Sequence, residues 1–267
     1  MIDTTAPSAP VITTISSELD IKDSTPTFVG NAEIGSIVDL YNGNEYLATT
    51  IAADGNFYIT SSQLADGNYN LTVKSTDAAG NTSSGSAAYA LTIDTTAPSA
   101  PVITTKTTVT NETTPIIEGT AEVGSTVALL IGETSAGTTT AGSDGAFSIT
   151  TGELADGDYS LTVTATDEAG NTSSASTAFA LTIDTTAPEA PVITTTTTVT
   201  NETTPTIEGT AEAGSTVELF NGDTSLGTAT AGSDGSFSIT SSQLADNIYT
   251  LTVTSTDVAG NESAESG

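Results

Sequence analysis

One twelve-residue phrase occurs three times in this chain and constrains its fold more than any other feature. Asp-Thr-Thr-Ala-Pro-Ser-Ala-Pro-Val-Ile-Thr-Thr begins at Asp3 and at Asp94, and it returns at Asp184 with Glu189 in place of the serine. The starts lie 91 and 90 residues apart, which is too long for a solenoid unit and typical of a small self-contained domain. We therefore predict three domains of one design, at residues 1–93, 94–183 and 184–267.

The second repeat contains seven short segments that favour β-strands and no helical period. The segments are 101–104, 115–120, 125–131, 137–141, 146–150, 159–165 and 178–183. We expect residues 107–114 to form a loop, and Asp144-Gly145 to turn a hairpin between the fourth and fifth segments. Seven strands in about ninety residues are typical of an immunoglobulin-like sandwich of two antiparallel sheets. The predicted fold class is all-β, with tandem immunoglobulin-like β-sandwiches arranged as an elongated rod.

A tyrosine opens the sixth segment of each repeat, inside the motif Leu-Ala-Asp-x-x-Tyr that ends at Tyr69, Tyr159 and Tyr249. This position matches the tyrosine corner of immunoglobulin-like domains, in which the hydroxyl bonds back to the backbone. The alternative is a half-exposed tyrosine without such a bond. The third repeat has no seventh segment after Asn261, so we expect its C-terminal strand to be truncated and its sixth strand to be an exposed edge.

The charge of the chain limits its partners and its means of stabilisation. The chain has thirty-three acidic residues and three lysines, which gives a net charge of −30. This charge argues against nucleic acid and anionic membranes as partners. Small domains usually need a stabilising cross-link such as a disulfide. Because this chain has no cysteine, we expect a bound metal ion to take the place of disulfides. The alternative is an acidic surface that only keeps the protein soluble. We also find no apolar segment long enough to span a membrane and no signal-peptide hydrophobic region.

Acidic residues recur in register at loops that strand order brings to one end of each domain. Oxygen ligands without histidine or cysteine favour Ca²⁺, which takes six to eight oxygens from flexible loops. Asn171 is a further candidate, through its amide or through the folding of its loop. The predicted ligands are Asp3, Glu33 and Asp77 in the first repeat, Asp94, Glu122 and Asp167 in the second, and Asp184, Glu212 and Asp257 in the third.

Two further aspartates are expected at the junctions between repeats. Asp66 lies in the loop that faces the Asp94 junction, and Asp156 lies in the loop that faces the Asp184 junction. Each is a candidate to make a calcium ion bridge neighbouring domains, or simply the residue that a tight Asp-Gly turn prefers. Residues before proline favour extended conformations, so the linker is short and stiff. A bound ion would lock it, giving a rod with calcium and a jointed chain without.

The chain offers little for catalysis. It has no histidine and no cysteine, so its serines lack a base, and no nucleophile elbow or phosphate-binding loop is present. Paired carboxylates are able to hydrolyse glycosides, but a pair repeated in three small domains is unlike an enzyme. We expect a protein that is not an enzyme.

Three motifs resemble the bacterial Ig-like repeats of giant, type I-secreted non-fimbrial adhesins. The first repeat departs slightly, with Asn31 and Ile37 where the others have threonine. The motifs are Asp-Thr-Thr-Ala-Pro-x-Ala-Pro-Val-Ile at Asp3, Asp94 and Asp184, Ala-Glu-x-Gly-Ser at Glu33, Glu122 and Glu212, and Thr-Asp-x-Ala-Gly-Asn at Asp77, Asp167 and Asp257.

The resemblance implies a monomeric, extracellular or surface-attached stalk, stiffened by calcium, which contacts the host-cell surface through another region of its parent protein. The alternative function is a set of repeats that themselves bind host glycans or a protein receptor. Such a binding module is expected to carry an aromatic platform or a loop unique to one repeat. We favour the stalk because the recurring Tyr159 and Phe147 occupy core-like positions.

Overall fold

The computed structural model describes residues 2–15 and 22–266, and the regular structure in them consists of β-strands. The all-β prediction is therefore confirmed. Two compact units are present, and each is described by itself. The first unit is Met1–Ser99 with Gly124–Thr126 and Ala165–Ser174, and the second is the rest of the chain.

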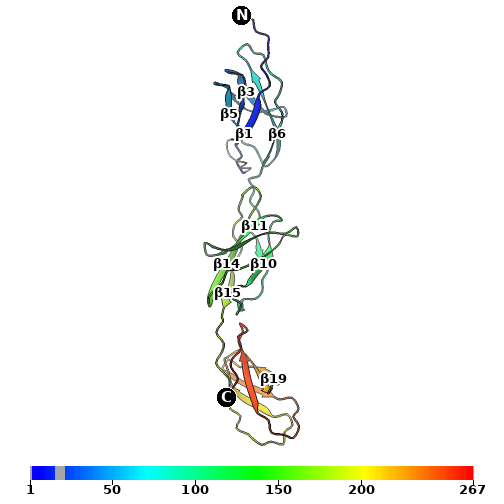
Figure 1. Ribbon diagram of the computed structural model, residues 1–267, viewed down its shortest axis with the longest axis vertical. Helices are drawn as coiled ribbons and strands as arrows, with labels where there is room; N and C mark the ends of the chain where they lie inside the picture. The colour runs from blue at the N-terminus through cyan, green and yellow to red at the C-terminus, as the bar shows by residue number, and fades with distance from the viewer. Residues whose placement is uncertain (1, 16–21, 267) are drawn as a thin grey trace. The chain divides into compact units, whose positions relative to one another are not determined.

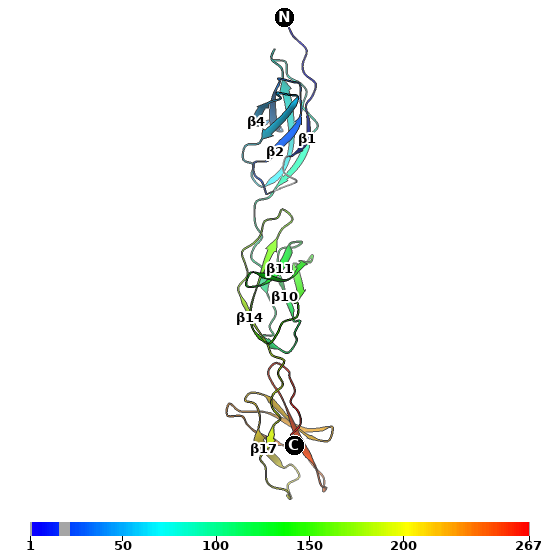
Figure 2. The same ribbon diagram turned by 60° about the vertical axis from the view of Figure 1, so that its left-hand side comes forward.

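The first repeat has two antiparallel sheets. One has the order β1-β2-β5 and the other β4-β3-β6-β7. Figures 1 and 2 show this repeat from two sides. The strands are β1 (Val11–Ile15), β2 (Thr27–Asn31), β3 (Ile37–Asn42), β4 (Glu45–Ile51), β5 (Asn56–Thr60), β6 (Gly67–Thr76) and β7 (Tyr89–Ile93).

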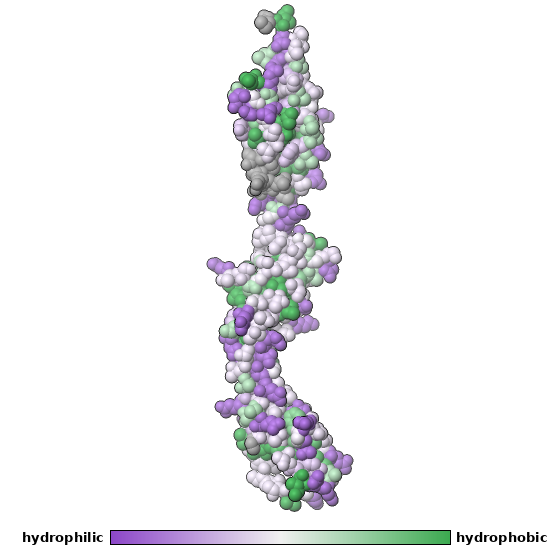
Figure 3. Space-filling view, in the orientation of Figure 1, coloured by the Kyte–Doolittle hydropathy of each residue, from purple (hydrophilic) through white to green (hydrophobic). Residues whose placement is uncertain are grey.

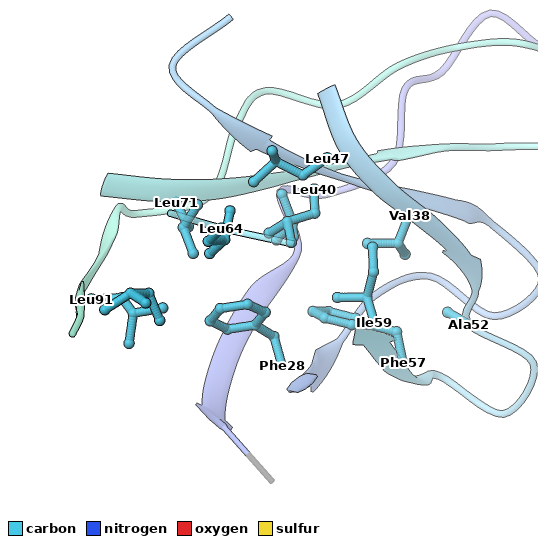
Figure 4. Packing of buried hydrophobic residues seen from close by; sticks show 12 residues of the cluster. Phe28, Val38, Leu40, Leu47, Ala52, Phe57, Ile59, Leu64, Leu71 and Leu91 are labelled. Atoms are coloured by element: carbon cyan, nitrogen blue, oxygen red, sulfur yellow. The ribbon is translucent and has the colours of Figure 1, made fainter. Parts of the chain in front are cut away.

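Alternation of apolar and polar residues decides which side of each strand is buried. In β5, Phe57 and Ile59 are buried while their neighbours are exposed, because successive side chains of a strand point to opposite faces. Phe28 of β2 is paired with Ile59 and is fully buried. Figure 4 shows Phe28 and Phe57 together with Leu40 in the resulting core. This packing between the sheets is what the period-two pattern of the sequence predicts.

The second repeat also has two sheets, and two short strands, β8 and β9, precede β10. Its sheets have the orders β13-β10-β8 and β12-β11-β14-β15-β9. Because β9 pairs in parallel with β15, the loop predicted for residues 107–114 is wrong at Val109–Thr110. The strands are β8 (Val102–Ile103), β9 (Val109–Thr110), β10 (Ile116–Thr120), β11 (Thr126–Ile131), β12 (Thr134–Thr140), β13 (Ala146–Thr150), β14 (Gly157–Thr166) and β15 (Phe179–Ile183).

The hairpin predicted at Asp144-Gly145 is also wrong. A turn does form there, closed by hydrogen bonds between Gly142 and Ala146 and between Gly145 and Gly142. However, β12 belongs to one sheet and β13 to the other, so the connection crosses the sandwich. Asp-Gly specifies a tight turn, but burial of Phe147 against the β10 sheet decides which strand comes next to β13.

The third repeat has the sheets β16-β17-β20 and β19-β18-β21 within the residues described. In the second repeat, β14 begins at Gly157 because β15 pairs with residues 157–161. The equivalent residues 247–250 have no such partner strand in the described part of the chain, and β21 begins only at Leu251. The strands are β16 (Val192–Ile193), β17 (Thr206–Thr210), β18 (Thr216–Asn221), β19 (Thr224–Thr230), β20 (Ser236–Thr240) and β21 (Leu251–Thr256).

All three tyrosine corners are present. The hydroxyl of Tyr69 donates to the carbonyl of Ala65 at 2.8 Å, and the bonds of Tyr159 and Tyr249 to the equivalent carbonyls measure 2.9 and 3.0 Å. The prediction is confirmed, and each bond fixes the loop that carries the Leu-Ala-Asp sequence.

Hydrophobic and hydrophilic residues are mixed on the face of the molecule seen in Figure 3.

Candidate functional site at the repeat junctions

Each junction begins with an Asp-Thr-Thr segment that a local turn holds in place. Asp94 follows directly on β7, and its carboxylate Oδ1 accepts a hydrogen bond from the backbone N–H of Thr96 at 3.1 Å. The bonds from Thr5 to Asp3 and from Thr186 to Asp184 both measure 3.0 Å. The two prolines that follow are buried in every copy, so the linker is anchored as well as extended.

Asp66, from the loop before β6, holds the first linker by three hydrogen bonds. Its Oδ1 accepts from the backbone N–H and the hydroxyl of Thr95, at 2.9 and 2.7 Å. Its Oδ2 accepts from the hydroxyl of Thr96 at 2.5 Å. The tyrosine corner fixes the loop that presents this carboxylate. Asp66 therefore lies at the junction, as its place in the strand order predicts, and both of its oxygens are engaged there.

Asp156 repeats this arrangement at the second linker. It accepts from the N–H and hydroxyl of Thr185 at 3.1 and 2.8 Å, and from the hydroxyl of Thr186 at 3.2 Å. The hydroxyl bond from Thr185 is the main cause that lowers the pKa of Asp156 below its ordinary value. The hydroxyl of Thr96, followed by that of Thr95, lowers the pKa of Asp66 in the same way. Both carboxylates are stabilised in the charged form because they accept several donors.

On its other side, the first linker is held by Asn171, which follows β14. Its Nδ2 donates to the backbone carbonyl of Asp94 at 2.9 Å and to Oδ2 of Asp167 at 3.0 Å. The backbone N–H of Asn171 donates to Oδ1 of Asp167 at 2.8 Å. Asn171 thus folds its loop and joins that loop to the linker, which is the second of the two roles considered for it.

The other two repeats contain the same clamp. Asn81 donates to the carbonyl of Asp3 at 3.3 Å and to Asp77 at 2.8 Å. Asn261 donates to the carbonyl of Asp184 at 2.7 Å and to Asp257 at 2.8 Å. The side chain of Asn81 is the largest cause that lowers the pKa of Asp77.

For Asp257, burial raises the pKa, but the bonds from Asn261 and the loop N–H groups outweigh it, and the pKa is lowered. The charged carboxylate is therefore favoured even where this loop is partly shielded from water.

The glutamates are placed differently from the aspartates. The carbonyl of Glu33, rather than its carboxylate, accepts the N–H and hydroxyl of Ser36 in the turn between β2 and β3. Glu212 forms the same turn with Ser215, and it lines a shallow depression together with Glu189. In the second repeat, Glu122 lies in the equivalent turn between β10 and β11.

In each repeat an asparagine links the backbone of one predicted ligand to the carboxylate of another. The amide of Asn171 donates both to the backbone carbonyl of Asp94 and to the carboxylate of Asp167. Within residues 2–15 and 22–266, no three acidic side chains are grouped closely enough to hold a metal ion. The donor chemistry suits calcium, but these carboxylates alone do not assemble its site.

Sequence reasoning missed the threonines that bind Asp66 and Asp156. Their signal was present, because Thr-Thr follows the aspartate in all three copies of the phrase.

A second missed feature is contact between successive repeats within each unit. The N–H of Asn111, after β9, donates to the carbonyl of Ala259 at 3.1 Å. A Cβ added to Gly170 would lie 3.6 Å from Nζ of Lys22, which occupies the position equivalent to Asn111.

A comparison with known protein families shows which family these repeats belong to. The bacterial Ig-like domain family matches residues 13–95, 102–185 and 193–267. The chain belongs to this family. These bacterial Ig-like repeats are 34% identical over 212 residues to Exoglucanase B of Cellulomonas fimi, an alignment that covers 73% of this chain and 19% of that protein. The chain therefore spans about a fifth of the length of this relative.

Similar solved structures include fibronectin(III)-like modules of Clostridium thermocellum CbhA, at 18% identity and a TM-score of 0.41, covering 64% of this chain and 93% of that one. A biofilm-associated protein BSP domain has 16% identity and a TM-score of 0.28, covering 98% of this chain and 65% of that one. Neither likeness is close enough to bear on function.

No helix in the described residues is long and apolar enough to cross a membrane.

Proposed function

We propose that these bacterial Ig-like repeats form a non-catalytic spacer in an extracellular or surface-attached bacterial adhesin, where they hold a distal binding region away from the cell. The observation that carries the proposal is the recurrence of one junction design. The linkers that begin at Asp94 and Asp184 are bound on one side by Asp66 or Asp156, and on the other by Asn171 or Asn261. A spacer needs fixed joints, and the hydrogen bonds of this design restrain the linker.

The hydrogen bonds around the linker restrict its backbone directly. Thr95 and Thr185 each contribute both an N–H and a hydroxyl to one carboxylate, so rotation of the linker breaks several bonds together. The buried prolines add to this restriction because their φ angle is fixed. We infer that the angle between neighbouring repeats is confined by this arrangement.

Calcium remains part of the proposal as an additional stabiliser. The aspartate pairs Asp3–Asp77, Asp94–Asp167 and Asp184–Asp257 supply hard oxygen donors near each linker, and backbone carbonyls and water would have to complete the coordination. In calcium at ten times the dissociation constant, an ion bound only to the folded state stabilises it by about 1.4 kcal/mol.

Small-angle scattering and calorimetry with and without chelator test the two parts separately. If the junctions bind calcium, removing it lowers the thermal midpoint and increases the range of interdomain distances. Asp94→Ala should loosen the first junction and leave the second intact. Unchanged midpoint and maximum dimension in chelator would refute calcium binding.

The hydrogen-bonded spacer has its own test. Asp66→Ala and Asp156→Ala should each broaden the distance distribution in scattering, even in chelator. Asp246→Ala is the matched control, because Asp246 occupies the same loop position but no Asp-Thr-Thr segment follows it in this sequence. If Asp66→Ala and Asp246→Ala have equal effects, the linker is not held by Asp66.

The similarity to Exoglucanase B, rather than the geometry of the junctions, favours a second kind of parent protein. Exoglucanase B is named as an enzyme, and the similar region occupies 19% of it. We infer that repeats of this kind also act as spacers within secreted enzymes that contain a separate catalytic domain. Sequencing the gene on both sides of the region that encodes this chain distinguishes the two parents.

A further inference from the structure

The outer face of the β4-β3-β6-β7 sheet in the first repeat differs from the same face in the other repeats. On β3, Val38 and Leu40 are fully buried in the core. The side chains of Ile37, Asp39 and Tyr41 therefore point outward, because strand residues alternate between faces. Figure 1 labels β3 and β6 of this sheet, and Figure 2 labels β4.

Three rows of side chains cross this face. Tyr46 and Ile51 on β4 are 55% and 60% exposed, and Ile37 is 46% exposed. Two apolar rows are thus separated by a row that contains one acid and one cation. The rows are Tyr41 opposite Tyr46, Asp39 between Thr49 and Lys74, and Ile37 opposite Ile51.

The aromatic row has a defined geometry. The ring centroids of Tyr41 and Tyr46 are 6.0 Å apart with an angle of 74° between the planes, a favourable edge-to-face arrangement. The Nζ atom of Lys74 lies 5.5 Å from the centroid of Tyr41, within the range of a cation–π contact. The hydroxyl of Tyr41 is protonated at neutral pH and can donate a hydrogen bond, and burial, followed by the charge of Asp39, raises its pKa further.

The fold does not require these residues. The buried alternation of β3 is repeated in β11 and β18, where Val127, Leu129, Val217 and Leu219 are fully buried. The outward positions differ freely. The equivalents of Asp39, Tyr41, Tyr46 and Lys74 are Ala128, Leu130, Ser135 and Thr164 in the second repeat, and Glu218, Phe220, Ser225 and Thr254 in the third.

We propose that this face, defined by Ile37, Asp39, Tyr41, Tyr46, Ile51 and Lys74 and called the tyrosine face, binds a neutral polysaccharide. A sugar ring has C–H faces that pack on aromatic and aliphatic groups, and hydroxyl edges that bond to donors and acceptors. Tyr41 and Ile37 are four residues apart, or about 13 Å along a strand. An extended chain of sugar rings lying along β3 therefore reaches both apolar rows, with its hydroxyls beside Asp39 and Lys74.

Charge and size favour this occupant over others. The net charge of −30 repels anionic polymers, so neutral saccharides are favoured over acidic ones. At about 150–250 Å² for a whole aromatic side chain, the exposed parts of the tyrosine face amount to only a few hundred Å². A specific protein interface needs about 800 Å² per partner, so the face suits a saccharide better than a protein. This proposal goes beyond the spacer function and does not depend on it.

Affinity electrophoresis of the whole chain tests the proposal. Native gels contain hydroxyethyl cellulose, laminarin, galactomannan or, as an anionic comparison, polygalacturonate, and chelator is present throughout so that junction calcium does not contribute. We expect at least one neutral polymer to retard the wild type. Tyr46→Ser, which introduces the residue found in the other two repeats, should weaken binding by at least about tenfold, a loss of about 1.4 kcal/mol.

Tyr58→Ser is the matched control. Tyr58 is 65% exposed but lies on β5 in the opposite sheet, and the other repeats have Ser148 and Ser238 there. Normal retardation of Tyr58→Ser together with loss in Tyr46→Ser supports the tyrosine face. Equal migration of wild type and Tyr46→Ser in all three neutral gels overturns it, as does retardation by polygalacturonate alone. Concentration-dependent dimerisation in sedimentation velocity that Tyr46→Ser abolishes would assign the face to self-association and also overturn the proposal.

Discussion

Replacing Asn171 by alanine removes the side chain that joins the first linker to its own repeat. The variant loses one bond to the neutral carbonyl of Asp94 and one to the carboxylate of Asp167. A neutral hydrogen bond contributes about 1 kcal/mol and a bond to a charged group about 1.5–3 kcal/mol. Because Asn171 is half-buried and water compensates part of the loss, we expect the free energy of unfolding to fall by about 2 kcal/mol.

The other repeats provide an internal scale for this change. The distance from the asparagine Nδ2 to the linker carbonyl is 3.3 Å for Asn81, 2.9 Å for Asn171 and 2.7 Å for Asn261. Asn261 is also only 7% exposed, so its carboxylate partner is less able to bond to water. The bond to the carboxylate measures 2.8 Å for Asn81, 3.0 Å for Asn171 and 2.8 Å for Asn261, so alanine substitutions should cost about 2 kcal/mol at Asn81 and Asn171 and about 3 kcal/mol at Asn261.

Calorimetry of the whole chain measures this series. For a domain of this size, 1 kcal/mol shifts the midpoint by about 4–8 °C, so the Asn171→Ala transition should fall by about 8–16 °C. Asn70→Ala, an exposed change on β6, is the control and should stay within about 0.5 kcal/mol of the wild type. A wild-type midpoint for Asn171→Ala, or a greater loss at position 81 than at 261, would refute the reasoning.

Three other predictions concern the corner, the core and the linker. Tyr159→Phe removes only a hydroxyl that donates at 2.9 Å, so urea unfolding should show a loss of about 1 kcal/mol, and an unchanged urea midpoint would argue against the corner. Gly119→Ala places a Cβ 2.4 Å from the ring of Phe147, so denaturation should show a loss of about 3 kcal/mol, and a smaller cost than an exposed alanine substitution would contradict this packing. The lowered pKa of Asp66 means that its contribution is present above the unfolded value of about 3.9 and is lost as pH falls through the folded value. Amide exchange across acid pH should show this loss at the first linker, whereas Asp246→Ala should leave it unchanged.

Only part of the candidate site could be predicted from the sequence. Strand order places Asp94 and Asp167 at one end of the domain, and the structure joins them through Asn171. The role of Thr95 as a double donor to Asp66 was not predicted, because a threonine after an aspartate is usually explained by its own local turn. Only the folded structure brings Asp66, from the loop before β6, to this threonine.

The sequence by itself determined the number of repeats, the strands with clear alternation and the tyrosine corners. These features arise from local periodicity and turn chemistry, which act over a few residues. Tertiary structure decided that β12 and β13 lie in different sheets and that β9 pairs with β15, because pairing depends on which surfaces are buried together. It also decided that Tyr41 and Tyr46 meet on an outer face, since two tyrosines near a turn become a surface only when strand register places them side by side.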